Sequence, residues 1–154
     1  MKKITEISGG QTGVDRGALD AAINLEIPHG GWCPKGRLAE DGKISSKYQL
    51  KETYSRMYAV RTRRNISQAD ATLIISPCPF IGGTLLAITE TRHRNKPLFV
   101  VYPTRANYVQ IMEWLLTHRV SVLNVAGPRE SEEPEIYLYT YKIVSKILQM
   151  LNEK

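Results

Sequence analysis

The sequence lacks the features that would mark a membrane or secreted protein. It has no run of 18 consecutive apolar residues, so we expect no membrane-spanning helix. Its first residues lead straight into a strand-like run without the long apolar segment of a secretory signal. Only two cysteines are present, Cys33 and Cys78, and no CxxC spacing contains them. We therefore expect a cytoplasmic protein with two free thiols.

Metal-binding and common catalytic motifs are also missing. His29, His93 and His118 form neither HxH nor HExxH, and two cysteines supply too few ligands for a zinc site. We therefore predict no metal site. There is no GxSxG elbow, and neither cysteine has a histidine base near it in the sequence, although catalytic partners can be distant in sequence.

Positive charge is in excess, with 21 basic against 15 acidic residues and a formal charge of +6. This excess suits an anionic partner, either a phosphorylated small molecule or a nucleic acid. The densest cluster, residues 61–64 (RTRR), could equally be a solvated helix face. Because there is no aromatic stacking platform and no helix-turn-helix signature, we expect a phosphorylated small molecule rather than a nucleic acid.

The chain of 154 residues, 42% apolar, fits a single domain spanning 1–154. Strands are expected at 4–8, 29–33, 71–76, 98–102 and 121–126. Helices are expected at 13–25, 56–68, 84–95 and 105–118, with a last one after an N-cap at Ser131. Residues 35–51 are polar and predict a loop with at most one turn of helix. This alternation predicts an α/β, Rossmann-like doubly wound, mostly parallel sheet with helices on both faces.

In such a sheet the loops after the strands meet at one edge. Right-handed crossovers place the carboxyl end of every strand there, and ligands bind where the strand order reverses. We therefore expect the loops that begin near Ser8, Pro34, Pro77, Pro103 and Gly127 to converge on one site.

The most specific stretch is SGGQTGVDRGALDAA, from Ser8 to Ala22. Glycines at 9, 10 and 13 would let backbone N–H groups approach an anion at a helix N-terminus. The spacing is neither GxGxxG nor a Walker A loop, and tight turns with close packing are the alternative role. Gly17 is expected to let the helix lie close to the sheet.

A second glycine-rich junction, PCPFIGGTLLAITE, follows the strand at 71–76. If the two strands flank the switch point, both helix N-termini would face one crevice, and Thr12 and Thr84 could donate hydroxyls to the same oxyanion. Basic side chains that could add contacts are those of Lys35, Arg37, residues 61–64 and Arg129.

Several motifs together resemble a known family. SGGQTGVDRGALDAA, GWCPKGRLAEDG, RTRRNISQADATLI, GGT and LNVAGPRES occur in the order seen in the putative molybdenum carrier family. That family is similar to a larger Rossmann-like group that includes the phosphoribohydrolases and DNA-processing proteins. The resemblance implies a cytosolic homo-oligomer that binds the molybdenum cofactor (molybdopterin), a pterin-derived dithiolene with a terminal phosphate, or otherwise a nucleotide-like anion.

The resemblance also implies which residues bind the ligand. The matching positions are Gly9, Gly10, Gln11, Thr12, Gly13, Asp15, Arg16, Lys35, Gly36, Arg37, Asn65, Asp70, Gly82, Gly83 and Thr84, to which the residue pattern adds Arg129. For Asp15 and Asp70 a structural role, as a cap or as a partner of Arg16 or Arg64, is the alternative.

An enzymatic role would require a glutamate that this sequence does not place correctly. The phosphoribohydrolases carry PGGxGTxxE, whereas here the third residue after Thr84 is Ala87 and Glu90 lies six residues after it. Positions three and six residues along a helix do not share a face. We therefore predict a binding or carrier protein, with a nucleotide-processing phosphoribohydrolase-like enzyme as the alternative.

Overall fold

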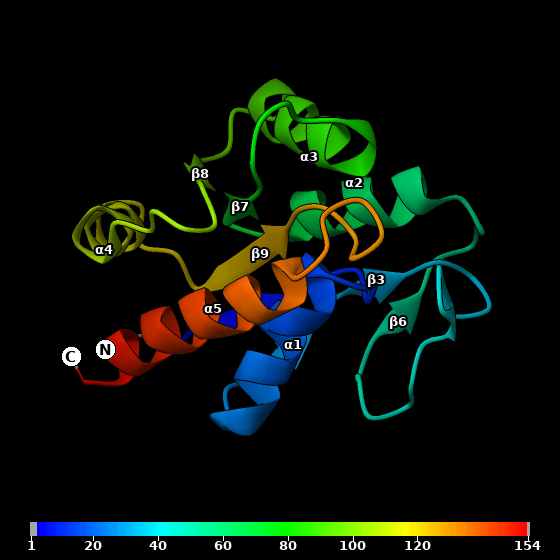
Figure 1. The fold of residues 1–154 in the computed structure, drawn as a ribbon, viewed down its shortest axis with the longest axis horizontal. Coiled ribbons are helices and arrows are strands. Elements are labelled where there is room, and N and C mark those ends of the chain that lie inside the picture. The colour runs from blue at the N-terminus through cyan, green and yellow to red at the C-terminus, as the bar shows by residue number, and fades with distance from the viewer. Residues whose placement is uncertain (1–2, 154) are drawn as a thin grey trace.

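A five-stranded parallel sheet forms the centre of the computed structural model, which describes residues 3–153 (Figure 1). Its strands are β1 (Thr5–Ile7), β2 (His29–Gly30), β7 (Ala71–Ile75), β8 (Leu98–Val101) and β9 (Val122–Ala126). The strand order is β2-β1-β9-β7-β8, and every neighbouring pair is parallel. The buried strand β7 is apolar along its length apart from Thr72, as expected for a strand covered on both faces.

Helices cover both faces of this sheet, which confirms the predicted fold class. They are α1 (Val14–Asn24), α2 (Tyr58–Gln68), α3 (Gly82–His93), α4 (Tyr108–Thr117) and α5 (Ile136–Asn152). The main apolar core joins α1, α4 and α5 to one face, and a smaller core joins α2 and α3 to the other. Figure 1 shows α1 beside α5 on one side and α2 beside α3 on the opposite side. Within residues 3–153, no helix combines the length and apolarity needed to cross a membrane.

The last strand, β9, lies between β1 and β7, so the two glycine-rich loops border it from either side. Because α1 and α3 leave β1 and β7 toward opposite faces, their N-termini approach the carboxyl edge of β9 from opposite sides. The sheet order therefore brings the loops after β1, β7 and β9 together.

The loop expected at 35–51 differs in the structure, because β4 (Leu38–Ala39), β5 (Gly42–Lys43) and β6 (Lys51–Glu52) there, together with β3 (Trp32–Cys33), form two small additional sheets. β3 pairs in parallel with β6, and β4 forms a hairpin with β5. The single strand expected at 29–33 is also wrong. Gly31 (φ 122°) separates β2 from β3, and a side chain there would overlap the carbonyl of Ser8.

The final helix begins later than expected. Ser131 is not its N-cap, because α5 starts at Ile136 and the Ser131 hydroxyl instead donates to Glu40 (2.5 Å). The Glu130 carboxylate caps the helix in its place, accepting from the backbone N–H groups of Glu135 (2.7 Å) and Tyr137 (3.0 Å).

Asp70 has the structural role that was left as an alternative. Its carboxylate accepts from the backbone N–H groups of Ser121 and Val122, both at 2.8 Å, and so fixes the start of β9 beside β7. This contact lies at the amino end of the strands, away from the edge where ligands bind.

Gly17 allows two helices, rather than a helix and the sheet, to approach closely. A Cβ at this position would lie 2.8 Å from the carbonyl oxygen of Tyr137 and 2.9 Å from Cβ of Thr140, both on α5. The absence of a side chain therefore sets the distance between α1 and α5.

We predict that Gly17→Ala destabilises the fold by about 1–3 kcal/mol, the cost of overpacking a close contact. This loss should exceed the helix-propensity gain, which is at most about 1 kcal/mol. The matched control is Gly83→Ala on α3, where a Cβ meets nothing within 4 Å. Urea unfolding measures both changes, and equal stability of Gly17→Ala and the parent chain would contradict this account of the α1–α5 contact.

Candidate functional site

A cleft of about 230 Å³ opens at the carboxyl edge of the sheet, above β9. Its walls are the loop after β1, helix α2, the start of α3 and the loop between β9 and α5, which crosses toward α2 in Figure 1. The lining residues are Gly9, Gln11, Asp15, Tyr58, Ala59, Arg61, Thr62, Asn65, Gly82, Gly83, Thr84, Leu86, Ala87, Asn124, Ala126, Gly127, Arg129 and Glu132. The predicted convergence of loops after the strands is therefore present for three of the five loops.

Arg61 is the most buried cation of the cleft, with only 9% of its surface exposed. Its Nη1 donates to the carbonyl of Gly9 (2.9 Å) and lies 3.3 Å from the Asp15 carboxylate, while Nε donates to the Thr62 hydroxyl (3.1 Å). Its Nη2 makes no hydrogen bond within residues 3–153, and the residue lines the cleft. A side chain at position 9 would overlap the guanidinium, which explains the glycine there.

Asp15 is the acidic partner in this contact, and the pKa of its carboxyl group is shifted. Its carboxylate also accepts from the backbone N–H of Gln11 (3.1 Å). Burial raises the pKa of Asp15, and the Arg61 charge and these backbone donors oppose the rise. A buried carboxyl with a shifted pKa in a cleft is a common feature of functional sites.

The N-terminus of α3 supplies open backbone donors. Its N-cap, Ile81, has no side-chain acceptor, and the N–H groups of Gly82 and Gly83 form no hydrogen bond within the described residues. A Cβ at Gly83 would face open space. The positive end of the helix macrodipole adds to these donors, so this end of the cleft favours an anion.

The N-terminus of α1, by contrast, has several of its donors bonded within the protein. The N–H of Val14 donates to the carbonyl of Pro128 (3.2 Å), and the N–H of Thr12 donates to Oε1 of Gln11 (3.0 Å). A Cβ at Gly13 would lie 2.5 Å from that same Pro128 oxygen. These loop glycines therefore serve close packing, as does Gly10, whose Cβ would collide with two apolar side chains.

The expected pairing of two threonine hydroxyls on one oxyanion is not formed. Thr84 lines the cleft, but Thr12 does not. Its hydroxyl is bonded to the Glu40 carboxylate and accepts from the backbone N–H of Glu130 (3.1 Å). Thr12 thus joins the β4–β5 hairpin to the loop after β9.

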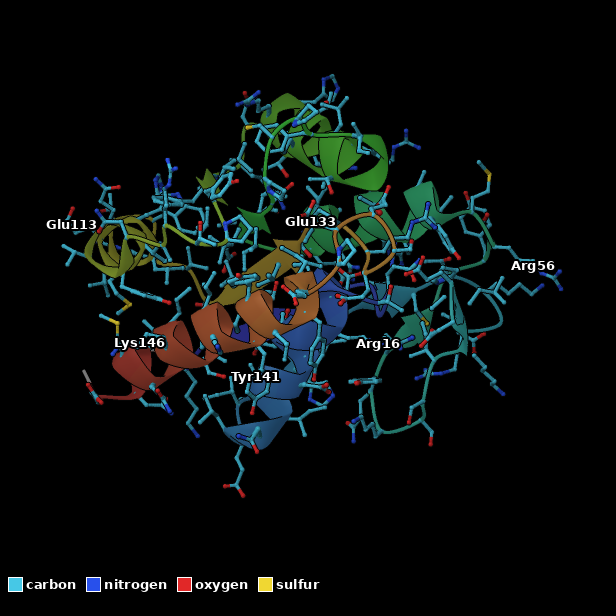
Figure 2. The ribbon with its side chains drawn as sticks, viewed as in Figure 1. Arg16, Arg56, Glu113, Glu133, Tyr141 and Lys146 are labelled. Carbon is cyan, nitrogen blue, oxygen red and sulfur yellow. The ribbon has the colours of Figure 1, made fainter. Side chains whose placement is uncertain are left out.

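The motif GWCPKGRLAEDG lies outside the cleft, and its Lys35, Gly36 and Arg37 are not among the lining residues. The Arg37 guanidinium donates to four backbone carbonyls of residues 44–50, and the N–H of Gly36 donates to Glu52 (2.6 Å). Arg16 forms a two-pronged ion pair with Asp41, and Figure 2 shows it reaching from α1 toward the side of β6. These side chains stabilise the segment around the small sheets.

The cluster at 61–64 divides into different roles. Arg61 enters the cleft, Arg63 pairs with Glu90 (3.5 Å), and Arg64 stacks on the Trp32 ring (4.3 Å). Glu90 also pairs with Arg94 (2.6 Å) and does not line the cleft, so the helix geometry that argued against its catalytic use agrees with its position. Neither Arg63 nor Arg64 lines the cleft.

Asn65, Arg129 and three polar residues that sequence reasoning missed also line the cleft. The Asn65 amide bonds the N–H (2.7 Å) and C=O (3.0 Å) of Trp32, so it holds β3 against α2. The sequence analysis did not identify Asn124 as a lining residue, although a polar residue within the apolar strand β9 could have indicated a functional position. Tyr58 and Glu132 were also missed, and no local pattern distinguishes Glu132 from its acidic neighbours.

Glu6 is a second buried carboxyl, on β1 below the cleft, and is 0% exposed. Ser8 Oγ lies 2.5 Å from its Oε2 and 3.0 Å from the carbonyl of Val125, while Oε1 has no partner. Burial raises the pKa of Glu6 well above its ordinary value, and the nearby Asp15 charge adds to the rise. A protonated Glu6 can donate to Ser8, which then donates to Val125.

We predict that Glu6 lowers folding stability as pH rises from about 4.5, the ordinary pKa of a glutamate, to its raised pKa in the folded protein. In that window the folded protein holds the Glu6 proton and the unfolded chain has lost it, so each group of this kind costs about 1.4 kcal/mol per pH unit. Asp15, whose pKa is also raised, acts in the same direction. Glu6→Gln should make the slope of the unfolding free energy against pH less steep, by the contribution of one titrating group.

Urea unfolding between pH 5 and 8 measures this slope. The control is Glu113→Gln, since Figure 2 shows Glu113 at the outer side of α4 and it is exposed. An unchanged slope in Glu6→Gln would show that this carboxyl is ionised in the folded protein.

Comparison with known proteins gives two findings. Residues 6–148 match the circularly permutated YpsA SLOG family. The chain is also similar to a solved structure, that of a putative molybdenum carrier protein from Syntrophus aciditrophicus SB at 1.45 Å resolution. The two share 41% identity and a TM-score of 0.90, covering 96% of this chain and 95% of the other.

None of the curated proteins matches the chain. The family match nevertheless spans nearly all of it, and the similar structure supports both the predicted Rossmann-like fold and the resemblance to molybdenum carriers. The chain belongs to the circularly permutated YpsA SLOG family.

Proposed function

We propose that this protein is a carrier that holds the molybdenum cofactor by its terminal phosphate, in the cleft above β9. The observation that carries the proposal is that two groups of donors without a hydrogen-bond partner line this one cleft. They are Nη2 of the buried Arg61 and the N–H groups of Gly82 and Gly83. Guanidinium and helix N-terminal N–H groups are donors that proteins use for phosphate. The similar structure, described as a putative molybdenum carrier, supports the choice of ligand.

The remaining lining residues fit the rest of such a ligand. A pterin presents N–H donors and ring acceptors, and the side chains of Asn124 and Tyr58 offer matching polar groups. Asp15 and Glu132 balance the charges of Arg61 and Arg129, so the cleft does not favour a ligand composed only of negative charge. At about 230 Å³ the cleft is somewhat below the size of typical small-molecule pockets, so it would enclose the phosphate and adjoining atoms rather than the whole cofactor.

The metal itself would be held by the dithiolene of the ligand. Within residues 3–153, no group of three or more His, Cys, Asp or Glu side chains is placed to hold a metal ion. The role of this chain would be to bind the phosphate, orient the ring and shield the ligand.

A nucleoside monophosphate is the second candidate ligand, because it offers the same phosphate with a different ring. The feature that favours it, and with it a hydrolytic activity, is the buried Asp15 in the cleft, since general acids and bases often have raised pKa values. Release of free base from a nucleoside monophosphate, lost in Asp15→Asn, would favour that alternative.

Native mass spectrometry of freshly purified protein tests the carrier proposal directly. We expect a retained species at one ligand per chain, with the mass of molybdopterin and a pterin fluorescence after oxidative release. A retained nucleotide would support the second candidate. Protein without bound ligand that also fails to bind added molybdopterin would refute the carrier function.

We predict that Gly83→Val weakens binding of the phosphorylated ligand at least tenfold while leaving the fold intact. The branched side chain would enter the open space beside the α3 amides, where it meets no protein atom. Gly13→Val is unsuitable for this purpose, because it would disturb folding at Pro128. Isothermal titration measures the affinity, and Thr89→Val on the exposed side of α3 is the control. Equal affinity of Gly83→Val and the parent would place the phosphate elsewhere.

A further inference from the structure

Gln11 places a buried amide in the wall of the cleft that the loop after β1 forms. The residue is 6% exposed, and its Oε1 accepts from the backbone N–H groups of Thr12 (3.0 Å) and Glu40 (2.9 Å). These two N–H groups fix the orientation of the amide, because only its oxygen can accept from them. Nε2 of Gln11 is therefore left with two hydrogens to donate, and it has no partner within residues 3–153.

Thr84 offers a second neutral donor from another wall of the cleft, at the start of α3. It is 3% exposed, and its hydroxyl forms no hydrogen bond within the part of the chain that the structure describes. Neither this hydroxyl nor Nε2 of Gln11 is enclosed by protein, since the enclosed side-chain atoms that lack a partner there belong to Glu6, Thr140 and Ser145. Buried polar groups are normally paired, so two unpaired donors at one cleft indicate a ligand that pairs them.

Arg61 supplies a third donor, from α2. Its Nη1 and the backbone N–H of Gln11 both reach Oδ2 of Asp15, at 3.3 and 3.1 Å, so the guanidinium lies beside the loop that carries Gln11. The Asp15 carboxylate offsets the charge of the guanidinium, while Nη2 has no partner within residues 3–153. Three separate elements of the cleft wall thus each present one side-chain donor without a partner: the loop after β1, α2 and α3.

We propose that Gln11, Arg61 and Thr84 form a three-sided donor set that selects a terminal phosphate over a phosphate that links two groups. A phosphate monoester presents three oxygens without a substituent, one for each element, whereas a phosphodiester presents only two. The inference rests on the proposed function, because it assumes that the phosphate lies in this cleft. It adds the class of ligand: the cargo is the monophosphate form of the cofactor, and a dinucleotide form, whose phosphate is linked to a second group, is rejected.

The selectivity follows from the cost of leaving a buried donor unpaired. A diester in the cleft could pair two of the three donors, and the third would lose its water without gaining a partner. Sites built to hydrogen-bond a ligand group discriminate strongly against analogues that lack this group. Because two of the donors, on Gln11 and Thr84, are neutral, each can be removed without changing the charge of the cleft.

The experiment compares methyl phosphate with dimethyl phosphate at pH 7, each titrated into the parent chain, Gln11→Met, Thr84→Val and Thr91→Val. NMR chemical shifts follow binding, and urea unfolding measures the stability of each variant. Thr91→Val is the matched control, since Thr91 lies on the same helix, is 0% exposed, donates to the carbonyl of Ala87 (2.7 Å) and does not line the cleft. Each ester keeps its own charge throughout, so a change in preference between parent and variant reports the lost hydrogen bond.

We expect the parent and Thr91→Val to bind methyl phosphate about tenfold or more tightly than dimethyl phosphate. In Gln11→Met and Thr84→Val this preference should fall by about threefold or more, because two donors then suffice for two oxygens. Thr84→Val should keep the stability of the parent, since the hydroxyl has no partner in the folded protein. Gln11→Met also loses the contacts to Thr12 and Glu40, so Thr84→Val decides the outcome if Gln11→Met does not fold.

Two results would overturn the selectivity and leave the phosphate site in place. One is a parent that binds both esters equally, and the other is a preference that persists unchanged in the folded variants. If neither ester binds to the folded parent, the proposed function itself fails, and the selectivity fails with it.

Discussion

The contact of Arg61 with Gly9 and Asp15 is the interaction on which the site depends. It joins α2 to the loop after β1, two segments about fifty residues apart in the sequence, and it forms the base of the cleft. A buried ion pair adds little net stability, but removing one partner leaves an uncompensated buried charge that costs about 3–5 kcal/mol. The pair therefore acts mainly by fixing the position of the Arg61 guanidinium at the edge of the sheet, where its Nη2 has no partner within residues 3–153.

Electrostatics in the cleft differ from those of the whole chain. The formal charge of +6 indicates an anionic partner, yet most of the basic residues considered in the sequence are used elsewhere: Arg37 on backbone carbonyls, Arg16 on Asp41, and Arg63 on Glu90. Within the cleft two cations face two carboxylates. The placement of individual donors and acceptors therefore describes the cleft better than the net charge of the chain does.

The two glycine-rich loops show how similar sequences can have different physical roles. Gly13 lacks a side chain because a backbone carbonyl lies against it, whereas Gly83 faces open space. Both loops begin helices after parallel strands, so the sequence pattern alone treats them as equivalent. The loop after β9 accounts for part of the difference, because its Pro128 carbonyl lies against Gly13 and accepts from the N–H of Val14, whereas the N–H groups of Gly82 and Gly83 have no partner within residues 3–153.

The sequence by itself determined the fold class and most element positions, because apolar periodicity and glycine or proline punctuation are local properties of the chain. It also indicated Asp15, Asn65, Arg129 and the glycines at 82 and 83 as lining residues. It did not reveal the small sheets at 31–52, because each of their strands is only two residues long and so leaves no alternating pattern to recognise. Only the tertiary structure decided which loop glycine faces open space, which arginine of the 61–64 cluster enters the cleft and where Glu132 lies. These outcomes depend on β9 lying between β1 and β7, and strand order is a long-range property that no local pattern encodes.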